Sequence, residues 1–112
     1  MTRHDALLRL RDMLYHARKV HEKAAGLDRE QFDADEDLRT VVTWHLLIVG
    51  EAASRVEADQ RAALSGIPWN RVIGMRNRLV HDYGNIDDEV VWTTATQRVP
   101  ELIAYLEHVL DE

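Results

Sequence analysis

The chain has 112 residues, of which 46% are hydrophobic and 30% charged, with no cysteine and a formal net charge of -6. These values are typical of one globular domain, and they exclude disulfides and thiolate metal sites. The negative charge argues against broad, non-specific nucleic-acid binding, which normally needs a basic surface. No segment is apolar for long enough to span a bilayer, and the N-terminus has no signal-like core. We therefore expect a single cytoplasmic domain over residues 1–112.

A first amphipathic helix is expected to end at Gly26. Its apolar stripe repeats every three or four residues and consists of Leu7, Leu10, Leu14, Ala17 and His21. The polar segment 27–34 is expected to form a loop. Asp35 is the expected N-cap of a second helix, because its carboxylate can accept a hydrogen bond from a free N–H of the first turn.

The second expected helix is apolar on nearly all sides in its middle. One face carries Leu38, Val41, Val42, His45, Val49, Ala52 and Val56, and Trp44, Leu47 and Ile48 project elsewhere. A helix in a small bundle needs only one apolar side. The second side therefore indicates burial against another subunit, most simply in a two-fold homodimer. The alternative is a helix that is buried centrally within one chain.

After a polar connection over residues 60–66, a third helix is expected to begin at Pro68, which suits a first helical turn, and to end at Tyr83-Gly84. Its core side would carry Val72, Ile73, Leu79 and Val80.

A turn over residues 85–87 follows, and Asp87 can cap a fourth helix. The apolar positions of that helix are Val91, Ala95, Val99, Leu102, Leu106 and Val109. Because Pro100 removes one helical hydrogen bond, we expect the helix to be kinked or split there. With no sustained strand alternation, the pattern predicts an all-α, up-and-down bundle of four main helices.

The segment 76–83 gathers polar groups at the expected end of the third helix. It contains Arg76, Asn77, Arg78, His81, Asp82 and Tyr83. In one continuous helix, Arg76 and Tyr83 would share a line, and Asn77 and His81 would share a neighbouring one. The helix C-terminus and Asp82 would both favour protonation of the imidazole.

These residues suit the cleavage of RNA without a metal. Arginine makes planar phosphate contacts, and histidine exchanges a proton near neutral pH. His81 would move a proton while a ribose 2′-OH attacks the neighbouring phosphate, and Arg76 would stabilise the developing charge. A single histidine would have to act as both the acid and the base, whereas a dimer would bring two histidines together. The alternative is that Arg76 and Arg78 are merely solvated and that His81 caps the last turn.

Charge is distributed unevenly along the chain. Between Trp69 and Tyr83 the sequence has three arginines and a single acidic residue, Asp82, whereas acidic residues predominate beyond Gly84. An anionic ligand is therefore expected at the Arg/His segment. The acidic remainder is either a solvated surface or a surface for a basic partner.

The other histidines are not expected to form a metal site. His45 lies within the apolar stripe of the second helix, which favours a hydrogen-bonded core or interface histidine. His16 and His21 are five residues apart and cannot share a helix face as a metal-binding pair.

Four residues separate Arg76 from His81, and one residue separates His81 from Tyr83. This spacing resembles the R-x4-H-x-Y signature of HEPN-domain toxins of the HepT kind. The resemblance extends to Ile67-Pro68-Trp69, Ile73-Gly74-Met75, residues 48–53 (IVGEAA) and Val90-Val91-Trp92, and so covers nearly the whole chain.

The resemblance implies a HEPN fold, a homodimer with the active cleft at its interface, and metal-independent ribonuclease activity with no cofactor. Arg76 and His81 would be the catalytic pair, supported by Asn77. The implied partner is a minimal nucleotidyltransferase antitoxin, which would neutralise the toxin by adding AMP to Tyr83. The added negative charge beside Arg76 would occupy the phosphate site and repel RNA. A non-catalytic HEPN adaptor, which binds nucleotide or docks a nucleotidyltransferase, is the alternative function.

Overall fold

The protein is an all-α bundle, as the sequence predicts. The computed structural model describes residues 2–80 and 84–111. In chain order its elements are α1 (Arg3–Ala24), α2 (Arg29–Asp33), α3 (Glu36–Ser54), α4 (Ala58–Ala63), α5 (Trp69–Ile73), α6 (Met75–Leu79), α7 (Asp88–Thr93), the π-helical turn η2 (Thr94–Arg98) and α8 (Val99–Leu110). In this described part of the chain, no helix is long and apolar enough to cross a membrane.

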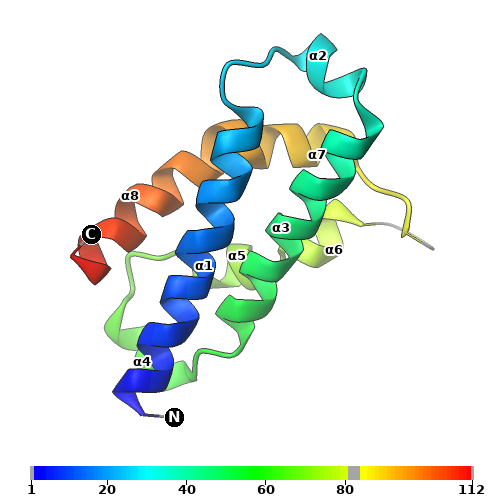
Figure 1. Cartoon of the computed structure of the whole chain (residues 1–112). Helices are drawn as coiled ribbons and strands as arrows, with labels where there is room; N and C mark the ends of the chain where they lie inside the picture. The colour runs from blue at the N-terminus through cyan, green and yellow to red at the C-terminus, as the bar shows by residue number, and fades with distance from the viewer. Residues whose placement is uncertain (1, 81–83, 112) are drawn as a thin grey trace.

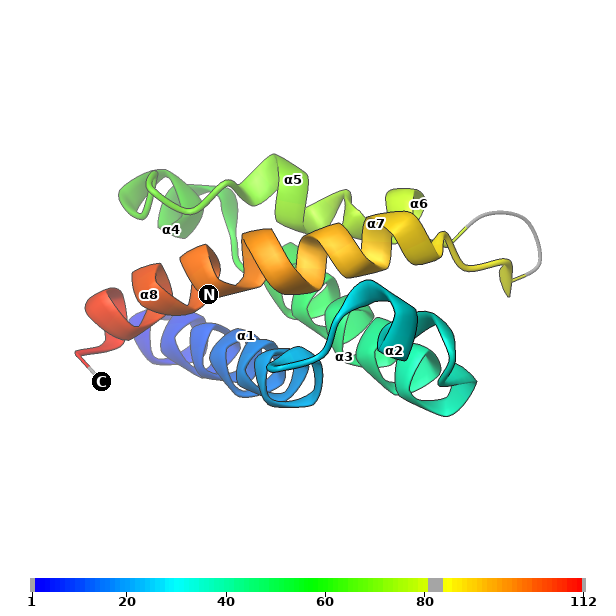
Figure 2. The ribbon, with the colours of Figure 1, turned by 90° about the horizontal axis from the view of Figure 1, so that it is seen from above.

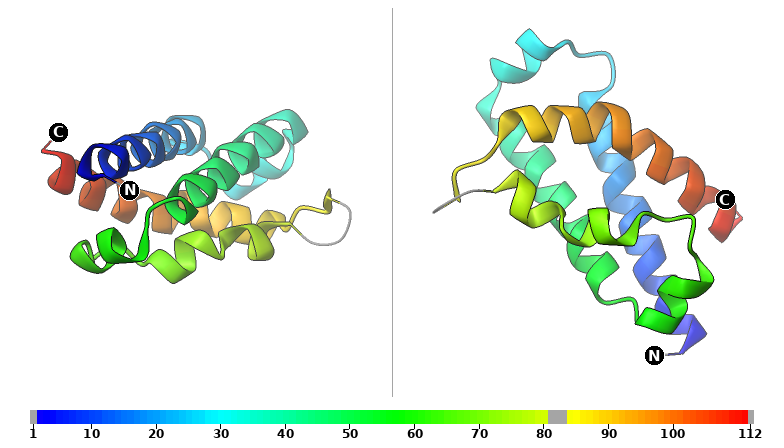
Figure 3. Two further views of the ribbon diagram at one scale, coloured as in Figure 1. Left: turned by 90° about the horizontal axis from the view of Figure 1, so that it is seen from below. Right: turned by 180° about the vertical axis from the view of Figure 1, so that it is seen from behind.

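The helices form two layers. α1 and α3 lie side by side and antiparallel in one layer (Figure 1). The α5–α6 and α7–η2–α8 segments both lie on the same side of that pair (Figure 2). From behind, these two segments are seen to run next to each other across α1 and α3 (Figure 3). α1, α3, α5–α6 and α7–η2–α8 are thus the four main helical segments of the predicted bundle.

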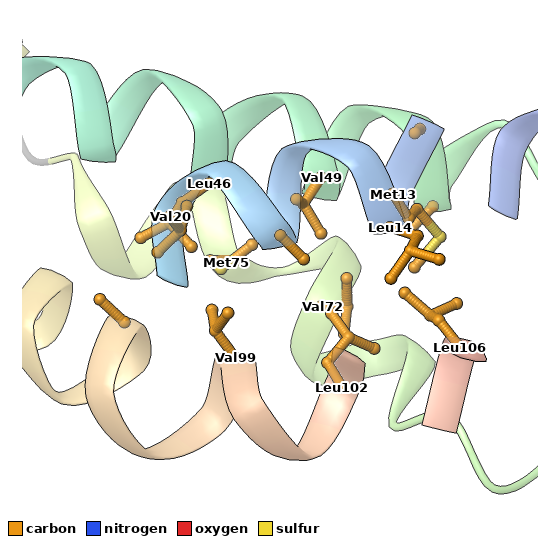
Figure 4. Packing of buried hydrophobic residues seen from close by; sticks show 14 of the residues in the cluster. Met13, Leu14, Val20, Leu46, Val49, Val72, Met75, Val99, Leu102 and Leu106 are labelled. Carbon is orange, nitrogen blue, oxygen red and sulfur yellow. The ribbon is translucent and has the colours of Figure 1, made fainter. Parts of the chain in front are cut away.

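All four segments contribute to one hydrophobic core. Side chains from both layers point into the same space, among them Leu14, Val20, Leu46, Val49, Val72, Met75, Val99, Leu102 and Leu106 (Figure 4). All of these named side chains are less than a tenth exposed. Burial of these apolar groups is the main force that holds the two layers together.

The N-terminal helix ends where the sequence predicts. α1 stops at Ala24, and Gly26 adopts a positive φ of 78°, which a residue with a side chain rarely adopts. His21, which we expected on the apolar stripe, is instead exposed, and Val20 and Ala24 complete the stripe.

Two segments expected to be non-helical contain short helices. The predicted loop 27–34 includes α2, which the buried Phe32 anchors against Trp92 with ring centroids 5.1 Å apart. Its start is a capping box, in which the Asp28 side chain accepts a hydrogen bond from the Gln31 N–H, and the Gln31 side chain accepts one from the Asp28 N–H. α4 occupies part of the polar connection before Pro68.

α3 packs against α1 within its layer and against α5, α6 and α7 of the second layer. The predicted cap is confirmed, because the Asp35 carboxylate accepts a hydrogen bond from the Leu38 N–H at 3.0 Å. On the second apolar side of α3, Leu47 and Ile48 are half-buried and Trp44 is 53% exposed, and Val41 of the first face is 39% exposed. The helix ends at Ser54, so Val56 lies buried just beyond it rather than on its face.

Gly50 lets α3 and α5 approach closely. A Cβ atom at this position would lie 3.1 Å from the carbonyl oxygen of Val72, closer than ordinary van der Waals contact. Ala53, one turn further along α3, is fully buried. Small residues at this crossing therefore bring α5, and with it the start of the Arg/His segment, close to the core.

The third predicted helix is broken and shorter than expected. Pro68 is the N-cap of α5, one position before the first turn, and the Trp69 indole N–H donates to the Leu64 carbonyl at 3.0 Å. The helix is interrupted at Gly74, where a Cβ would lie 2.9 Å from the Asn70 carbonyl oxygen. It then ends at Leu79 and not at Tyr83-Gly84, because Val80 is extended, with φ -121° and ψ 121°.

The fourth predicted helix is divided before Pro100, as expected. Val99 donates its N–H to the carbonyl of Thr94, five residues earlier, instead of four as in an α-helix. Val91, Ala95 and Val99 are each four residues apart, which at about 100° per residue would drift by about 80° around a regular helix. The wider π turn removes this drift and keeps all three side chains in the core.

Candidate active site and adjoining groove

The described part of the candidate site lies on α6. Arg76, Asn77 and Arg78 are exposed there, while Met75 and Leu79 are buried and fix the helix on the core. Within residues 2–80 and 84–111, Arg76 makes no ion pair, so its guanidinium faces solvent. Arg78 behaves differently, because its guanidinium donates a hydrogen bond back to the carbonyl of Arg71.

The chain on either side of the Arg/His segment is held together. Val80 and Ile86 form an antiparallel β-bridge, and the Asp87 N–H donates to the Leu79 carbonyl at 2.8 Å. The Asp87 side chain in turn accepts from the Val90 N–H at 3.2 Å and caps α7, which confirms the predicted cap. These contacts join the end of α6 to the start of α7.

His81, Asp82 and Tyr83 lie outside the described residues. The helix on which we expected Arg76 to share a line with Tyr83, and Asn77 with His81, ends at Leu79, and Val80 is extended. The expected position of His81 near a helix C-terminus falls on one of the residues outside the described part. The catalytic assignment of Arg76 and His81 therefore stays a prediction based on the motif.

Ion pairs connect the start of α7 to the rest of the bundle. Arg39 on α3 lies 3.3 Å from the carboxylate of Asp88 and also donates hydrogen bonds to the carbonyls of Phe32 and Asp33. Arg29 on α2 lies 2.9 Å from Glu89. Both α2 and α3 thus hold the segment that follows the candidate site.

A groove of about 650 Å³ lies between α5–α6 and α7–η2–α8. Its apolar lining comes from α3 and from both segments of the second layer. Three arginines also line it: Arg71 from α5, Arg78 from α6 and Arg98 from η2. Pockets of this size and mixed character commonly bind small organic ligands. Sequence reasoning placed Arg71 and Arg78 in a basic segment but did not connect Arg98 with them.

A pair of histidines occupies the space between α1 and α3. The Nδ1 atoms of His16 and His45 are 2.9 Å apart, which makes one ring the donor and the other the acceptor of a shared hydrogen bond. The prediction that His45 is a hydrogen-bonded core histidine is confirmed. Burial lowers the pKa of both imidazoles, and the pKa of His45 is lowered further by the charge on His16.

Exposed aromatic rings flank this pair. Tyr15 and Trp44 are more than half exposed, and their centroids lie 5.0 and 5.6 Å from that of His16. Among the described residues, no three histidine, aspartate or glutamate side chains gather in a way that could hold a metal ion.

The family model described as "Ribonuclease HepT-like" matches residues 7–109, which include the whole bundle core and the Arg/His segment. The chain belongs to the HepT-like ribonuclease family. No solved structure matches the HepT-like chain significantly.

Several relatives match the HepT-like chain over nearly their full length. "Putative RNase MJ1380" of Methanocaldococcus jannaschii is 31% identical over 102 residues, which cover 91% of this chain and 94% of that protein. "Putative RNase TTE0752" of Caldanaerobacter subterraneus subsp. tengcongensis is 28% identical, with 92% of each chain covered. "Probable ribonuclease HepT" of Thermococcus cleftensis is 29% identical over 83% of this chain and 84% of its own.

Proposed function

We propose that this HepT-like protein is a metal-independent endoribonuclease. In the proposed reaction the ribose 2′-oxygen attacks the adjacent phosphorus, and the bond from phosphorus to the 5′-oxygen of the next nucleotide breaks. A general base takes the 2′-OH proton and a general acid supplies a proton to the leaving 5′-oxygen. The products are a 2′,3′-cyclic phosphate and a 5′-hydroxyl end.

Each polar residue of the Arg/His segment has a role in this proposal. Arg76 stabilises the negative charge on the phosphoryl oxygens, and His81 transfers the proton. Asn77 and Arg78 support phosphate binding, and Asp82 favours the protonated imidazole. The observation that carries the proposal is the exposed Arg76 guanidinium, free of ion pairs in the described part of the chain, within a chain of a ribonuclease family.

We place the active cleft between two copies of the chain. The segment 76–83 supplies one histidine per chain, whereas the reaction needs both an acid and a base. A homodimer formed through α3 and the Arg/His segment would bring two imidazoles and two Arg76 side chains together. The exposed Trp44 and Val41 on α3 support an interface there, since large apolar side chains are usually covered.

The first experiment compares wild type with His81→Ala on a mixed RNA substrate in EDTA, with mass spectrometry of the product ends. Wild type should cleave and leave cyclic phosphate, and His81→Ala should not. His108→Ala is the matched control, because His108 is exposed on α8 and lies apart from the site. Equal cleavage by wild type and His81→Ala would refute the role of the imidazole.

We further propose that the enzyme is the toxin of a toxin–antitoxin pair in which a minimal nucleotidyltransferase adds AMP to Tyr83. The transferred group brings a phosphate next to Arg76, where it would compete with RNA for the same cation. Tyr83→Phe should remain an active ribonuclease that the partner with ATP can no longer neutralise. Continued AMP incorporation into Tyr83→Phe would refute this modification site.

The alternative function is a non-catalytic adaptor that holds nucleotide or docks a nucleotidyltransferase. The net charge of -6 and the single histidine of the segment favour it. If folded, dimeric wild type cuts no RNA in the experiment above, the adaptor becomes the better explanation.

A further inference from the structure

The groove between α5–α6 and α7–η2–α8 combines two kinds of surface. Its aliphatic lining includes Val49 from α3, Val72 from α5 and Leu102 from α8. Its lining also includes the threonines Thr93 and Thr94, which can donate or accept hydrogen bonds. A lining that combines apolar and polar groups suits a flat, partly polar ring better than it suits a purely aliphatic ligand.

The charged residues of the groove leave an excess of positive charge. Within the described residues, the guanidinium groups of Arg71 and Arg98 make no ion pair. The Arg78 guanidinium donates to the Arg71 backbone carbonyl, which holds the Arg78 side chain against the end of α5. Of the two carboxylates that line the groove, Glu89 is already paired with Arg29 at 2.9 Å. Glu101 is therefore the carboxylate that a ligand would meet.

The groove opens beside the candidate active site. Arg78 lies on the same short helix as Arg76, two residues further on, and Val90 of α7 lines the groove four residues after the β-bridge partner Ile86. The groove and the candidate active site therefore share the helix α6.

We propose that this groove binds one nucleotide of the RNA, next to the phosphate that is cleaved. The base lies against the aliphatic lining, and the phosphate of this nucleotide is bound by Arg71, Arg78 and Arg98. Glu101 accepts a hydrogen bond from a base amino group or a ribose hydroxyl. The proposal rests on the proposed ribonuclease function and adds to it a subsite outside the R-x4-H-x-Y motif.

Three features favour a nucleotide over other occupants. The volume of about 650 Å³ falls in the range of small-molecule sites. Arginine guanidinium groups match phosphate in geometry and charge. Single-stranded RNA is usually recognised by bases that are unstacked and placed on a protein surface, and the aliphatic lining of this groove provides such a surface.

Binding can be tested separately from cleavage. In the His81→Ala background, an RNA trinucleotide remains intact and can be titrated by calorimetry and by NMR of methyl-labelled protein. We expect intermolecular NOEs between base protons and the methyl groups of Val72 and Leu102. Changing Arg98→Ala should weaken binding by about fivefold or more, as expected for loss of a charged hydrogen bond. Arg9→Ala is the matched control, because it removes the same charge from α1, outside the groove.

A second ligand tests the position of the base. A trinucleotide that lacks one base should bind more weakly than the complete one and should lose the NOEs to the groove methyl groups. If Arg98→Ala binds as tightly as its control and no base proton contacts Val72 or Leu102, the proposed subsite is wrong. Methyl shifts that change on dilution of the free protein would assign the groove to a second copy of the chain and would also overturn the proposal.

The outcomes separate this inference from the proposed function. Cleavage by wild type, with no effect of Arg98→Ala on trinucleotide binding, would leave the ribonuclease intact and refute the subsite. Trinucleotide binding in the groove by a protein that never cuts RNA would support the nucleotide site and refute the enzyme.

Discussion

The His16–His45 pair should make the stability of the bundle depend on pH. In the shared hydrogen bond, one Nδ1 donates and the other accepts, so protonation of the acceptor would place two N–H groups against each other. Burial lowers the pKa of both rings below the value of about 6.5 that histidine has in an unfolded chain. Asp12 opposes this for His16, whereas Lys19 and Lys23 lower the pKa of His45 further.

The sign of the effect follows from proton binding. Below pH 6.5 the unfolded chain binds protons that the folded histidine pair does not bind, so acid favours unfolding. Each proton bound only by the unfolded chain lowers the free energy of unfolding by about 1.4 kcal/mol per pH unit. Because an unfolded histidine is already half protonated at pH 6.5, the pair should lower the stability between pH 6.5 and 5.5 by up to about 1 kcal/mol for each ring that stays neutral.

The assay is urea unfolding followed by Trp fluorescence at pH 7.5, 6.5 and 5.5. The His16→Asn/His45→Asn double variant should be less stable at pH 7.5 but should lose less stability on acidification than wild type. His108→Asn, on the exposed face of α8, should keep the wild-type pH dependence. If the double variant and wild type lose the same free energy between pH 7.5 and 5.5, the pair does not control this pH dependence.

Two further predictions concern glycine and aromatic positions near the site. Gly74→Ala should lower the free energy of unfolding by about 1–3 kcal/mol in a denaturant titration. The reason is that its Cβ would lie 2.9 Å from the Asn70 carbonyl oxygen, so the α5–α6 break would have to shift. Unchanged or raised stability would contradict this prediction. Phe32→Ala should cost about 3–5 kcal/mol and release α2, because the ring is fully buried against Trp92. Amide exchange of residues 29–33 that matches wild type would show that α2 does not depend on this ring.

The long periodic helices could be predicted from the sequence, whereas the breaks could not be placed correctly. The apolar spacing in α1 and α8 and the caps at Asp35 and Asp87 are local signals, and the structure confirms them. The end of the third helix depends on tertiary contacts instead. Leu79 accepts from Asp87, and Val80 pairs with a residue six positions later, so the helix stops a turn early.

The sequence contains a local signal for the short helix α2, although the segment was expected to be a loop. Asp28 and Gln31 have the spacing of a capping box, and Phe32 follows them as a buried anchor. The groove, by contrast, has no local signature. Arg98 lies 27 residues after Arg71, and only the packing of η2 beside α5 puts both on one cavity. The proposed roles of Arg76, Asn77 and Arg78 still come from the motif, and that of His81 does so entirely.

The π turn η2 has a consequence for how this chain can change in length. Its wider ring accommodates one residue more than a regular turn, and that residue is what keeps Val91, Ala95 and Val99 aligned. Loss of the exposed Gln97 would let the segment close as an ordinary α-helix with the same side chains facing inward. Loss of one residue within 94–98 is therefore a deletion that the core can tolerate, whereas the same deletion within α1 or α3 would rotate half of the helix out of register.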